Sequence, residues 1–166
     1  MDLVIDGYNL LGSRGGLWGD VAAKRDRLIS ELSGYARIKG HAIVVVFDGA
    51  ESAPAGPALP VSGVRVLFSR GERADDVVIR LSAGLGARGT IVSSDREVRD
   101  KCRPHGGVIL GVQEFERRLA GTLDGSLSSD QADPDPDASP GSAAKRGNPF
   151  RLSKVERKKR RRLERL

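Results

Sequence analysis

The chain has 166 residues, a formal net charge of +6 and a single cysteine, Cys102. This length suits one domain with a tail, and one cysteine excludes a disulfide framework and any zinc site built from several cysteines. No segment approaches the roughly 20 apolar residues that span a bilayer, and the start of the chain does not resemble a signal peptide. We therefore expect a cytoplasmic protein without a membrane partner.

Predicted strands and helices alternate along the first 120 residues. Amphipathic stretches over residues 20–38, 72–87 and 112–120 predict helices. Between them lie short apolar runs, which predict strands at Leu3–Ile5, Ala42–Phe47, Val64–Phe68, Thr90–Val92 and Val108–Leu110. Such alternation is typical of an α/β fold with a central, mainly parallel sheet and helices on both faces.

The composition changes near Thr122, so we divide the chain into a domain over residues 1–122 and two further segments. Residues 123–144 are rich in Asp, Ser and Pro, and this predicts an acidic, disordered linker. Residues 145–166 hold 11 Lys and Arg residues and carry a net charge of +9, which leaves −3 for the rest of the chain. This tail predicts a conditional helix that forms on a polyanion, for which nucleic acid is the usual partner.

Three predicted strands run into aspartates: Asp6 after the first, Asp48 after the second and Asp95 after the fourth. Because ligands of parallel α/β sheets bind at the carboxyl ends of the strands, these side chains are candidates for one site. One such aspartate alone often caps the next helix or turn. Three together repel each other unless a cation is bound, and hard oxygen ligands favour Mg²⁺ or Mn²⁺.

A fourth candidate lies in the segment SRGERADD. Ser69 and Glu72 have the spacing of a capping box, which would start a helix there. Asp75 is then on the same face of the helix as Val78, and its side chain should face the sheet. Asp76 is a further candidate metal ligand, although the helix dipole alone also favours an acid at this position.

Four other residues near these acids are candidates to bind a phosphodiester backbone. Asn9 and Ser94 carry polar side chains at strand ends, and each is equally suited to a structural hydrogen bond. Arg70 and Arg96 flank the acids, and guanidinium groups suit phosphate, although either arginine is also an ordinary surface charge.

Four segments, VIDGYNLL, VVFDG, GERADD and VSSDREV, resemble in sequence and order the YacP-like NYN domain, a family of PIN-like ribonucleases. The resemblance covers about residues 1–120. It implies a PIN-like three-layer sandwich and metal-dependent RNA cleavage, and some members are described as ribosome-associated endoribonucleases. It also implies that Asp6, Asp75 and Asp95 are the catalytic acids and that Asn9 matches the asparagine of the family motif.

The sequence departs from the family pattern at two places. Ser93 stands where threonine is usual, and this keeps the hydroxyl group. Arg80 lies in a region where the family often carries a further acid, so Asp76 is the candidate to replace that ligand.

The sequence therefore predicts a metal-dependent endoribonuclease that cleaves RNA, including RNA on the ribosome, and leaves a 5′-phosphate and a 3′-hydroxyl. One alternative is a non-catalytic RNA- or ribosome-binding module with a relict acidic site. Another is a phosphatase with an aspartyl nucleophile, but such enzymes usually carry a second aspartate where this chain has Tyr8.

Overall fold

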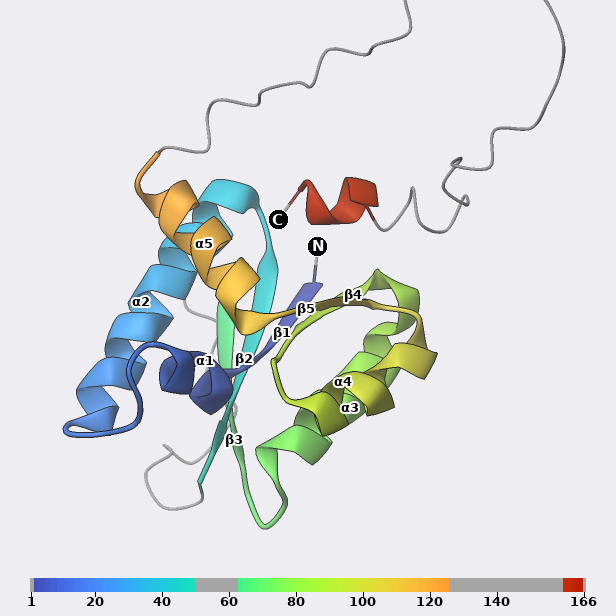
Figure 1. The fold of residues 1–166 in the computed structure, drawn as a ribbon, viewed down its shortest axis with the longest axis horizontal. Coiled ribbons are helices and arrows are strands. Elements are labelled where there is room, and N and C mark those ends of the chain that lie inside the picture. Colours follow the sequence, from blue (N-terminus) through green and yellow to red (C-terminus); the bar gives the residue numbers. More distant parts are fainter. Residues whose placement is uncertain (1, 50–62, 126–159, 166) are drawn as a thin grey trace, which may run out of the picture.

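The computed structural model describes residues 2–49, 63–125 and 160–165. In these residues, a parallel sheet of five strands lies between two layers of helices (Figure 1). The strands are β1 (Asp2–Asp6), β2 (Ala42–Asp48), β3 (Val64–Ser69), β4 (Gly89–Val92) and β5 (Val108–Leu110). The helices are α1 (Gly7–Ser13), α2 (Val21–Lys39), α3 (Ala74–Leu85), α4 (Arg96–Cys102) and α5 (Val112–Leu123), with short 3₁₀ turns η1 (Gly86–Arg88) and η2 (Arg103–His105).

The predicted α/β class and three-layer arrangement are confirmed. All five predicted strands are present, and the three predicted helices correspond to α2, α3 and α5. The short helices α1 and α4, of seven residues each, were not predicted. Each contains too few residues for a helical repeat of apolar positions to stand out in the sequence.

The strand order is β3-β2-β1-β4-β5, with parallel pairing throughout. The chain moves from β1 outward to β2 and β3, and then returns through α3 to β4 on the other side of β1. The direction of winding therefore reverses between β1 and β4. Above their carboxyl ends is the topological switch point, where ligands of such sheets bind.

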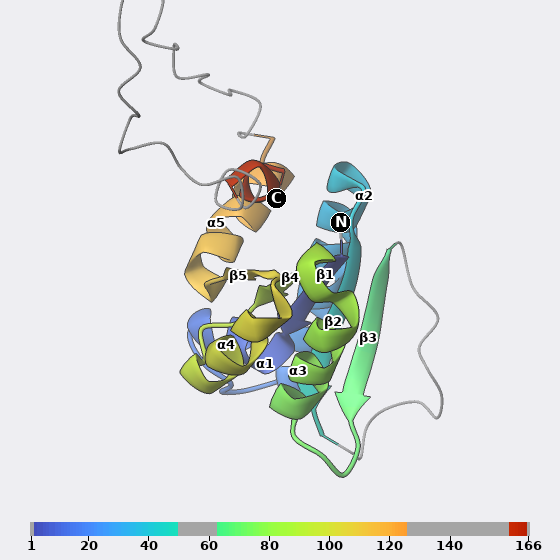
Figure 2. The same cartoon turned by 90° about the vertical axis from the view of Figure 1, so that its right-hand side faces the viewer.

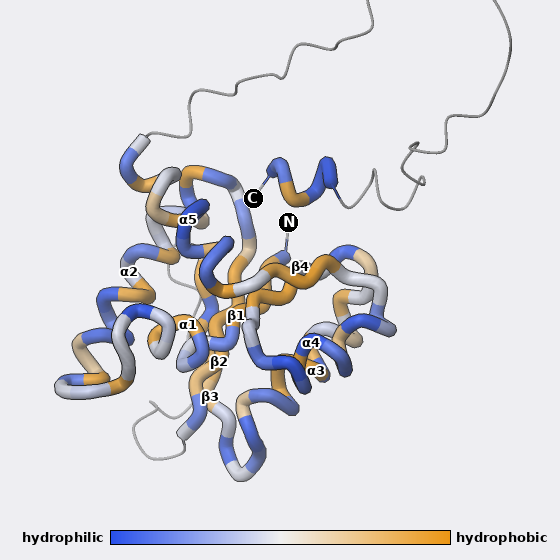
Figure 3. The backbone as a smooth tube through the Cα atoms, in the orientation of Figure 1, coloured by the Kyte–Doolittle hydropathy of each residue, from blue (hydrophilic) through white to orange (hydrophobic). Residues whose placement is uncertain are grey.

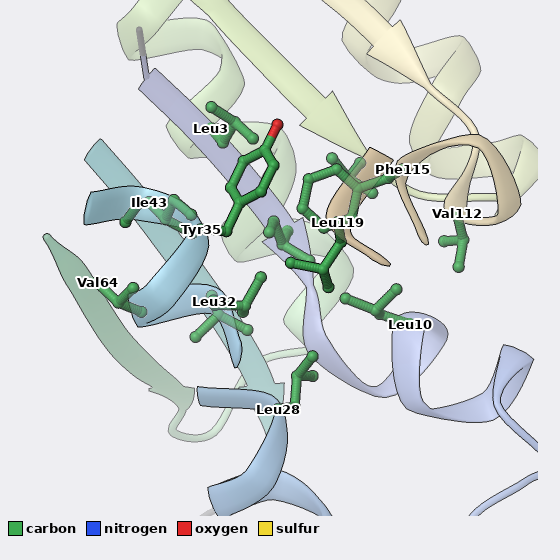
Figure 4. Close-up of a cluster of buried hydrophobic side chains, with 14 of the residues drawn as sticks. Leu3, Leu10, Leu28, Leu32, Tyr35, Ile43, Val64, Val112, Phe115 and Leu119 are labelled. Carbon is green, nitrogen blue, oxygen red and sulfur yellow. The ribbon is translucent and has the colours of Figure 1, made fainter. Parts of the chain in front are cut away.

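Successive residues of each strand alternate between two apolar cores, because side chains of a strand point to opposite faces. Leu3 and Ile5 pack with residues of α1, α2 and α5 (Figure 4), whereas Val4 packs with residues of α3 and α4. Figure 1 shows α2 and α5 on one side of the sheet and α3 and α4 on the other, and Figure 2 looks onto the side of α3 and α4. The hydropathy colouring in Figure 3 is orange along the strands between the two layers. A sheet covered on both faces explains the continuous apolar run of β2.

The residues that cap the long helix α2 explain where it starts and stops. The Asp20 side chain accepts a hydrogen bond from the backbone N–H of Ala23 and caps the first turn. Gly40 ends the helix with a φ of 65°, in the left-handed region that favours glycine. Only Gly40 and His41 separate the end of α2 from the start of β2.

Most of the predicted linker and tail lies in residues 126–159, outside the described residues, and the boundary at 122 stays a prediction. Residues 160–163 of the tail are helical and lie beside the N-terminus of the domain in both views (Figures 1 and 2). Leu163 packs against the α1–α2–α5 core. This part of the tail therefore contacts the domain itself. Formation of the tail helix on a polyanion stays a prediction. No helix of the described residues is long and apolar enough to cross a membrane.

Gly7, the first residue of α1, lies too close to Phe47 for a larger side chain. A Cβ atom at Gly7 would lie 2.4 Å from Cε1 of Phe47, whose ring is fully buried. We expect Gly7→Ala to lower the free energy of unfolding by roughly 1–3 kcal/mol through overpacking. Gly12→Ala in the same helix is the matched control, because a Cβ there would meet nothing within 4 Å; it should stabilise the protein by up to about 1 kcal/mol. Equal urea denaturation curves for the two variants would contradict this close contact.

Candidate active site

The acidic residues predicted from the sequence lie around the switch point between β1 and β4. Asp6 is the last residue of β1, and Asp95 follows β4 by three residues. In the sheet register, Ile5 of β1 pairs with Val92 of β4, so the two strands end level with each other. The topology therefore brings Asp6 and Asp95 to the carboxyl ends of two neighbouring strands, as the strand-end pattern predicted.

Asp6 is the most buried acid of the cluster, with only 6 % of its surface exposed. Burial is the largest cause that raises its pKa to about 6, and the charges of Asp75, Asp95 and Asp48 contribute to the same rise. The backbone N–H of Asn9 opposes this rise by donating a hydrogen bond of 3.1 Å to Asp6 Oδ1. Asp6 is thus both the cap of α1 and a carboxylate under repulsion from three neighbours.

Asp95 likewise combines a structural and an electrostatic role. Its Oδ1 accepts a hydrogen bond of 3.1 Å from the backbone N–H of Val98 and caps α4. The fully buried Ser93 accepts a bond from the backbone N–H of Asp95 through its hydroxyl, also at 3.1 Å. Among the hydrogen bonds of the described residues, Asp6 and Asp95 each use only Oδ1, so capping leaves Oδ2 of both available to a ligand.

Asp75 lies at the second position of α3 and turns toward the cluster, as predicted. Its side chain is 20 % exposed, between the buried residues Ala74 and Val78. Burial raises the pKa of Asp75; the guanidinium of Arg73, with which it forms an ion pair, lowers it, and the charge of Asp95 raises it again. Asp76, one position on, is exposed on the outer side of the helix.

The predicted capping box of Ser69 and Glu72 is wrong. The helix begins at Ala74 after Arg73, which makes no side-chain capping bond. Ser69 is the last residue of β3 and lies opposite Asp48 in the sheet, where its hydroxyl donates a hydrogen bond of 2.8 Å to Asp48 Oδ1. Glu72 instead forms an ion pair with Arg80 at 2.6 Å. The Ser69 hydroxyl therefore bonds across the sheet to Asp48, whereas the sequence pattern predicted that it would cap a helix.

Asp48 lies at the rim of the site. It extends two residues beyond Val46, which is level with Asp6 in the register of β1 and β2. Its side chain is exposed, and one oxygen accepts the bond from Ser69. Its charge nevertheless contributes to the raised pKa of Asp6, which places it within electrostatic reach of the cluster.

Two charged residues near the acids, Glu97 and Arg73, were not among the predicted site residues. Glu97, in the first turn of α4, is close enough for its charge to raise the pKa of Asp75. A hydrogen bond from Lys101 lowers the pKa of Glu97 itself. The signal available in the sequence was spacing: Glu97 is two residues after Asp95, in the first turn of the helix that Asp95 caps.

Asn9 and Ser94 connect the elements that hold the acids. The Asn9 side-chain oxygen accepts a hydrogen bond of 2.9 Å from the backbone N–H of Ser94 and joins α1 to the loop after β4. The Ser94 hydroxyl accepts a bond of 3.1 Å from the backbone N–H of Val112, at the start of α5. These contacts fix Asp95 relative to Asp6. A role for Asn9 and Ser94 in binding phosphate stays a prediction.

Arg70 and Arg96, the two arginines predicted to bind substrate, are both exposed at this edge of the domain. Arg70 directly follows β3, and Arg96 is the first residue of α4. The Arg96 side chain is 95 % exposed and lies 3.8 Å from Asp100, a weak surface ion pair. Their positions are compatible with contacts to a long substrate at the rim.

The donor set of this cluster fits a hard divalent cation. Asp6, Asp75 and Asp95 offer carboxylate oxygens, which Mg²⁺ and Mn²⁺ prefer. The pKa of Asp6 is raised mainly by burial, and the charges of Asp75, Asp95 and Asp48 add to the rise. Within the described ranges, however, no three His, Cys, Asp or Glu side chains converge closely enough to hold one ion together as they stand. The fit therefore rests on donor chemistry and shared charge.

The five-stranded parallel sheet between two helical layers agrees with the PIN-like three-layer sandwich that the sequence motifs implied. Residues 3–162 match the family model of the YacP-like NYN domain, and the chain belongs to this family. The family is part of the PIN-like nuclease superfamily. The match extends well beyond residue 120, where the resemblance of the sequence motifs ended, and it includes most of the basic tail.

Solved structures agree with this assignment. The chain is similar to the crystal structure of Rae1 (YacP) from Bacillus subtilis, with a TM-score of 0.63 and 23% identity over 76% of this chain and 77% of that chain. A mutant of the same protein gives a TM-score of 0.61 and 24% identity over 76% and 78%. At these identities the likeness shows the fold. No curated protein matches the chain.

Proposed function

We propose that the protein is an endoribonuclease that hydrolyses RNA phosphodiester bonds with the help of Mg²⁺ or Mn²⁺. The observation that carries this proposal is the buried Asp6 at the switch point, whose pKa is raised to about 6 by burial and by the charges of Asp75, Asp95 and Asp48. Such a concentration of acids is costly for a fold and is typical of functional sites. Membership of a PIN-like nuclease family supports the same conclusion.

Asp6, Asp75 and Asp95 would hold the cation, with Asp48, Asp76 and Glu97 adding negative charge around them. A bound divalent cation would supply Lewis acidity, which activates water and neutralises charge on the phosphate. Asn9 maintains the spacing between Asp6 and Asp95 through its bond to Ser94. Arg70 and Arg96 would contact the phosphates on either side of the cleaved bond.

The basic tail favours RNA over a small phosphate ester as substrate, because its 11 cations suit a long polyanion. We extend the proposal to RNA on ribosomes, on the basis of the family resemblance, and to a cytoplasmic location. The buried, unpaired Cys102 is compatible with a reducing compartment.

Mapping the ends of RNA fragments tests the proposed reaction. Purified full-length protein should cut RNA in Mn²⁺ and leave 5′-phosphate and 3′-hydroxyl ends, and EDTA should abolish the cuts. A parallel reaction with translating ribosomes should yield cuts in ribosome-bound RNA. Products ending in 2′,3′-cyclic phosphate, or cleavage that persists in EDTA, would rule out hydrolysis by this site.

A non-catalytic RNA-binding module is the second candidate function. Two observations favour it: Asp75 is engaged by Arg73, and within the described part of the chain no three acids converge on one point. This alternative predicts RNA binding without cleavage and no change in thermal stability on adding Mn²⁺. The endoribonuclease proposal predicts both cleavage and stabilisation by Mn²⁺.

A further inference from the structure

The end of the chain docks at the amino ends of the strands, at the opposite end of the sheet from the acids. Leu163 packs against the α1–α2–α5 core, and its carbonyl oxygen accepts a hydrogen bond from Arg118. Arg162 donates a hydrogen bond to the carbonyl of Ala87, and the ring of His41 lies 3.1 Å from the carbonyl oxygen of Arg165. Contacts with three separate segments of the domain thus hold residues 160–165 in place.

This docking creates a pocket of about 840 Å³, which we call the basic pocket. Its cationic lining residues are Lys39, Arg88, Arg161, Arg162 and Arg165. The pocket lies at the amino ends of the strands, because Asp2 begins β1, and Lys39 and Arg88 directly precede the segments that enter β2 and β4. Asp6 ends the same strand β1, so Asp2 in the pocket and Asp6 in the acidic cluster are separated by about 13 Å, four steps of about 3.3 Å along the strand.

Within the described residues, the cations of the basic pocket outnumber its acids. Asp2 is the one acid in its lining. Among the ion pairs of the described residues, none includes any of the five cations, whereas the neighbouring Arg160 pairs with Glu164 at 3.3 Å. Burial lowers the pKa of Arg162, and the charge of Asp2 only partly opposes this. Five cations around one hollow with a single acid make a site that attracts an anion.

The lining also indicates which anion fits. Guanidinium groups bind phosphate oxygens through paired N–H donors. The pocket is large enough for more than one phosphate group, and its lining contains no Phe, Tyr or Trp on which a base would stack. Its only ring, His41, packs edge-on against Tyr35. The chemistry therefore suits a phosphate backbone without sequence preference.

We propose that the basic pocket binds the phosphate backbone of RNA at a second site, remote from the acids. The inference rests on the proposed function, because it takes RNA as the substrate. The tail then acts as one wall of a fixed binding site on the domain. An RNA long enough to reach both ends of the strands would bind at the basic pocket and at the acidic site together. Longer RNA should therefore bind more tightly than short RNA.

Binding of a fluorescent single-stranded RNA in EDTA tests the pocket without cleavage. The variant Lys39→Ser/Arg88→Ser/Arg161→Ser removes three pocket cations but keeps Arg162, which anchors the tail. We expect the Kd to rise at least about tenfold. The slope of log affinity against log salt concentration should become shallower by about two, as the loss of three phosphate contacts implies. The single variant Arg161→Glu should also weaken RNA binding. Because Arg161 is exposed, this substitution should leave the fold of the domain unchanged.

The matched control removes the same charge elsewhere: Arg27→Ser/Arg65→Ser/Arg117→Ser, at exposed positions of α2, β3 and α5. Equal losses of affinity in both triple variants, or tight pocket-dependent binding of polyglutamate, would overturn the proposal. Cleavage of a short RNA in Mn²⁺ is measured separately. If wild-type protein does not cleave, the proposed function fails, but the binding comparison still decides whether the pocket is an RNA site.

Discussion

Replacing Asp95 with asparagine is expected to lower the rate of Mn²⁺-dependent RNA cleavage by roughly 10³-fold, equivalent to about 4 kcal/mol of transition-state stabilisation. Asparagine keeps a side-chain oxygen that can accept the capping bond from Val98, so α4 should form normally. It removes the charge that the proposed cation needs. Single-turnover cleavage of a labelled RNA measures the rate, and circular dichroism checks the fold.

Asp100→Asn is the matched control for this variant. Asp100 lies in the same helix α4, and its exposed side chain pairs with Arg96 and Arg103 on the surface. Its substitution should change the cleavage rate by less than a few-fold. A fully active Asp95→Asn variant would show that the reaction takes place elsewhere on the molecule.

Replacing Asp6 with asparagine should make the protein more stable in EDTA at pH 7.5. The pKa of this carboxyl group is raised from 3.8 to about 6 in the folded protein, so at neutral pH the fold contains a carboxylate whose ionisation it disfavours. Removing that charge should raise the free energy of unfolding by about 2–3 kcal/mol, at 1.36 kcal/mol per unit of pKa. Asparagine can still accept the bond from Asn9 that caps α1.

The direction of the pH dependence follows from this shift. Because the pKa of Asp6 is higher in the folded than in the unfolded chain, folding is favoured when the group is protonated. Its contribution to stability is complete below about pH 4 and is lost as the pH rises through about 6. The advantage of Asp6→Asn over wild type should therefore grow across this interval and disappear below it.

Urea denaturation at several pH values, all in EDTA, measures this effect. The control is Asp20→Asn, which alters another aspartate that caps a helix but is exposed. It should change stability by a few tenths of a kcal/mol at most, with no comparable growth between pH 4 and pH 6. An Asp6→Asn variant that is less stable than wild type at pH 7.5 would mean that the carboxylate is structurally favourable.

The sequence was sufficient to predict that Asp6 and Asp95 lie at the same end of the sheet. Parallel strands end at one edge of a sheet, so Asp6 and Asp95 could be placed together from their positions after apolar runs. Asp75 could be added because helical spacing aligns it with Val78. These are local patterns, and the structure preserves them because the sheet is buried on both faces and tolerates no shift in register.

Contacts between distant segments could not be predicted in this way. The hydroxyl of Ser69 has an equally good local partner in a capping box, and only the pairing of β2 with β3 directs it to Asp48. The bond between Asn9 and Ser94 joins residues 85 positions apart. The docking of the tail depends on Leu163, a single apolar residue with no helical repeat around it.

Cleavage rate as a function of Mn²⁺ concentration, measured for wild type and Asp6→Asn on the same RNA, tests the proposed metal site most directly. Wild-type protein should be inactive in EDTA and should show saturable activation by Mn²⁺, whereas Asp6→Asn should remain inactive at every concentration. Equal activation curves, or full wild-type activity in EDTA, would show that the acids at the switch point do not form the catalytic site.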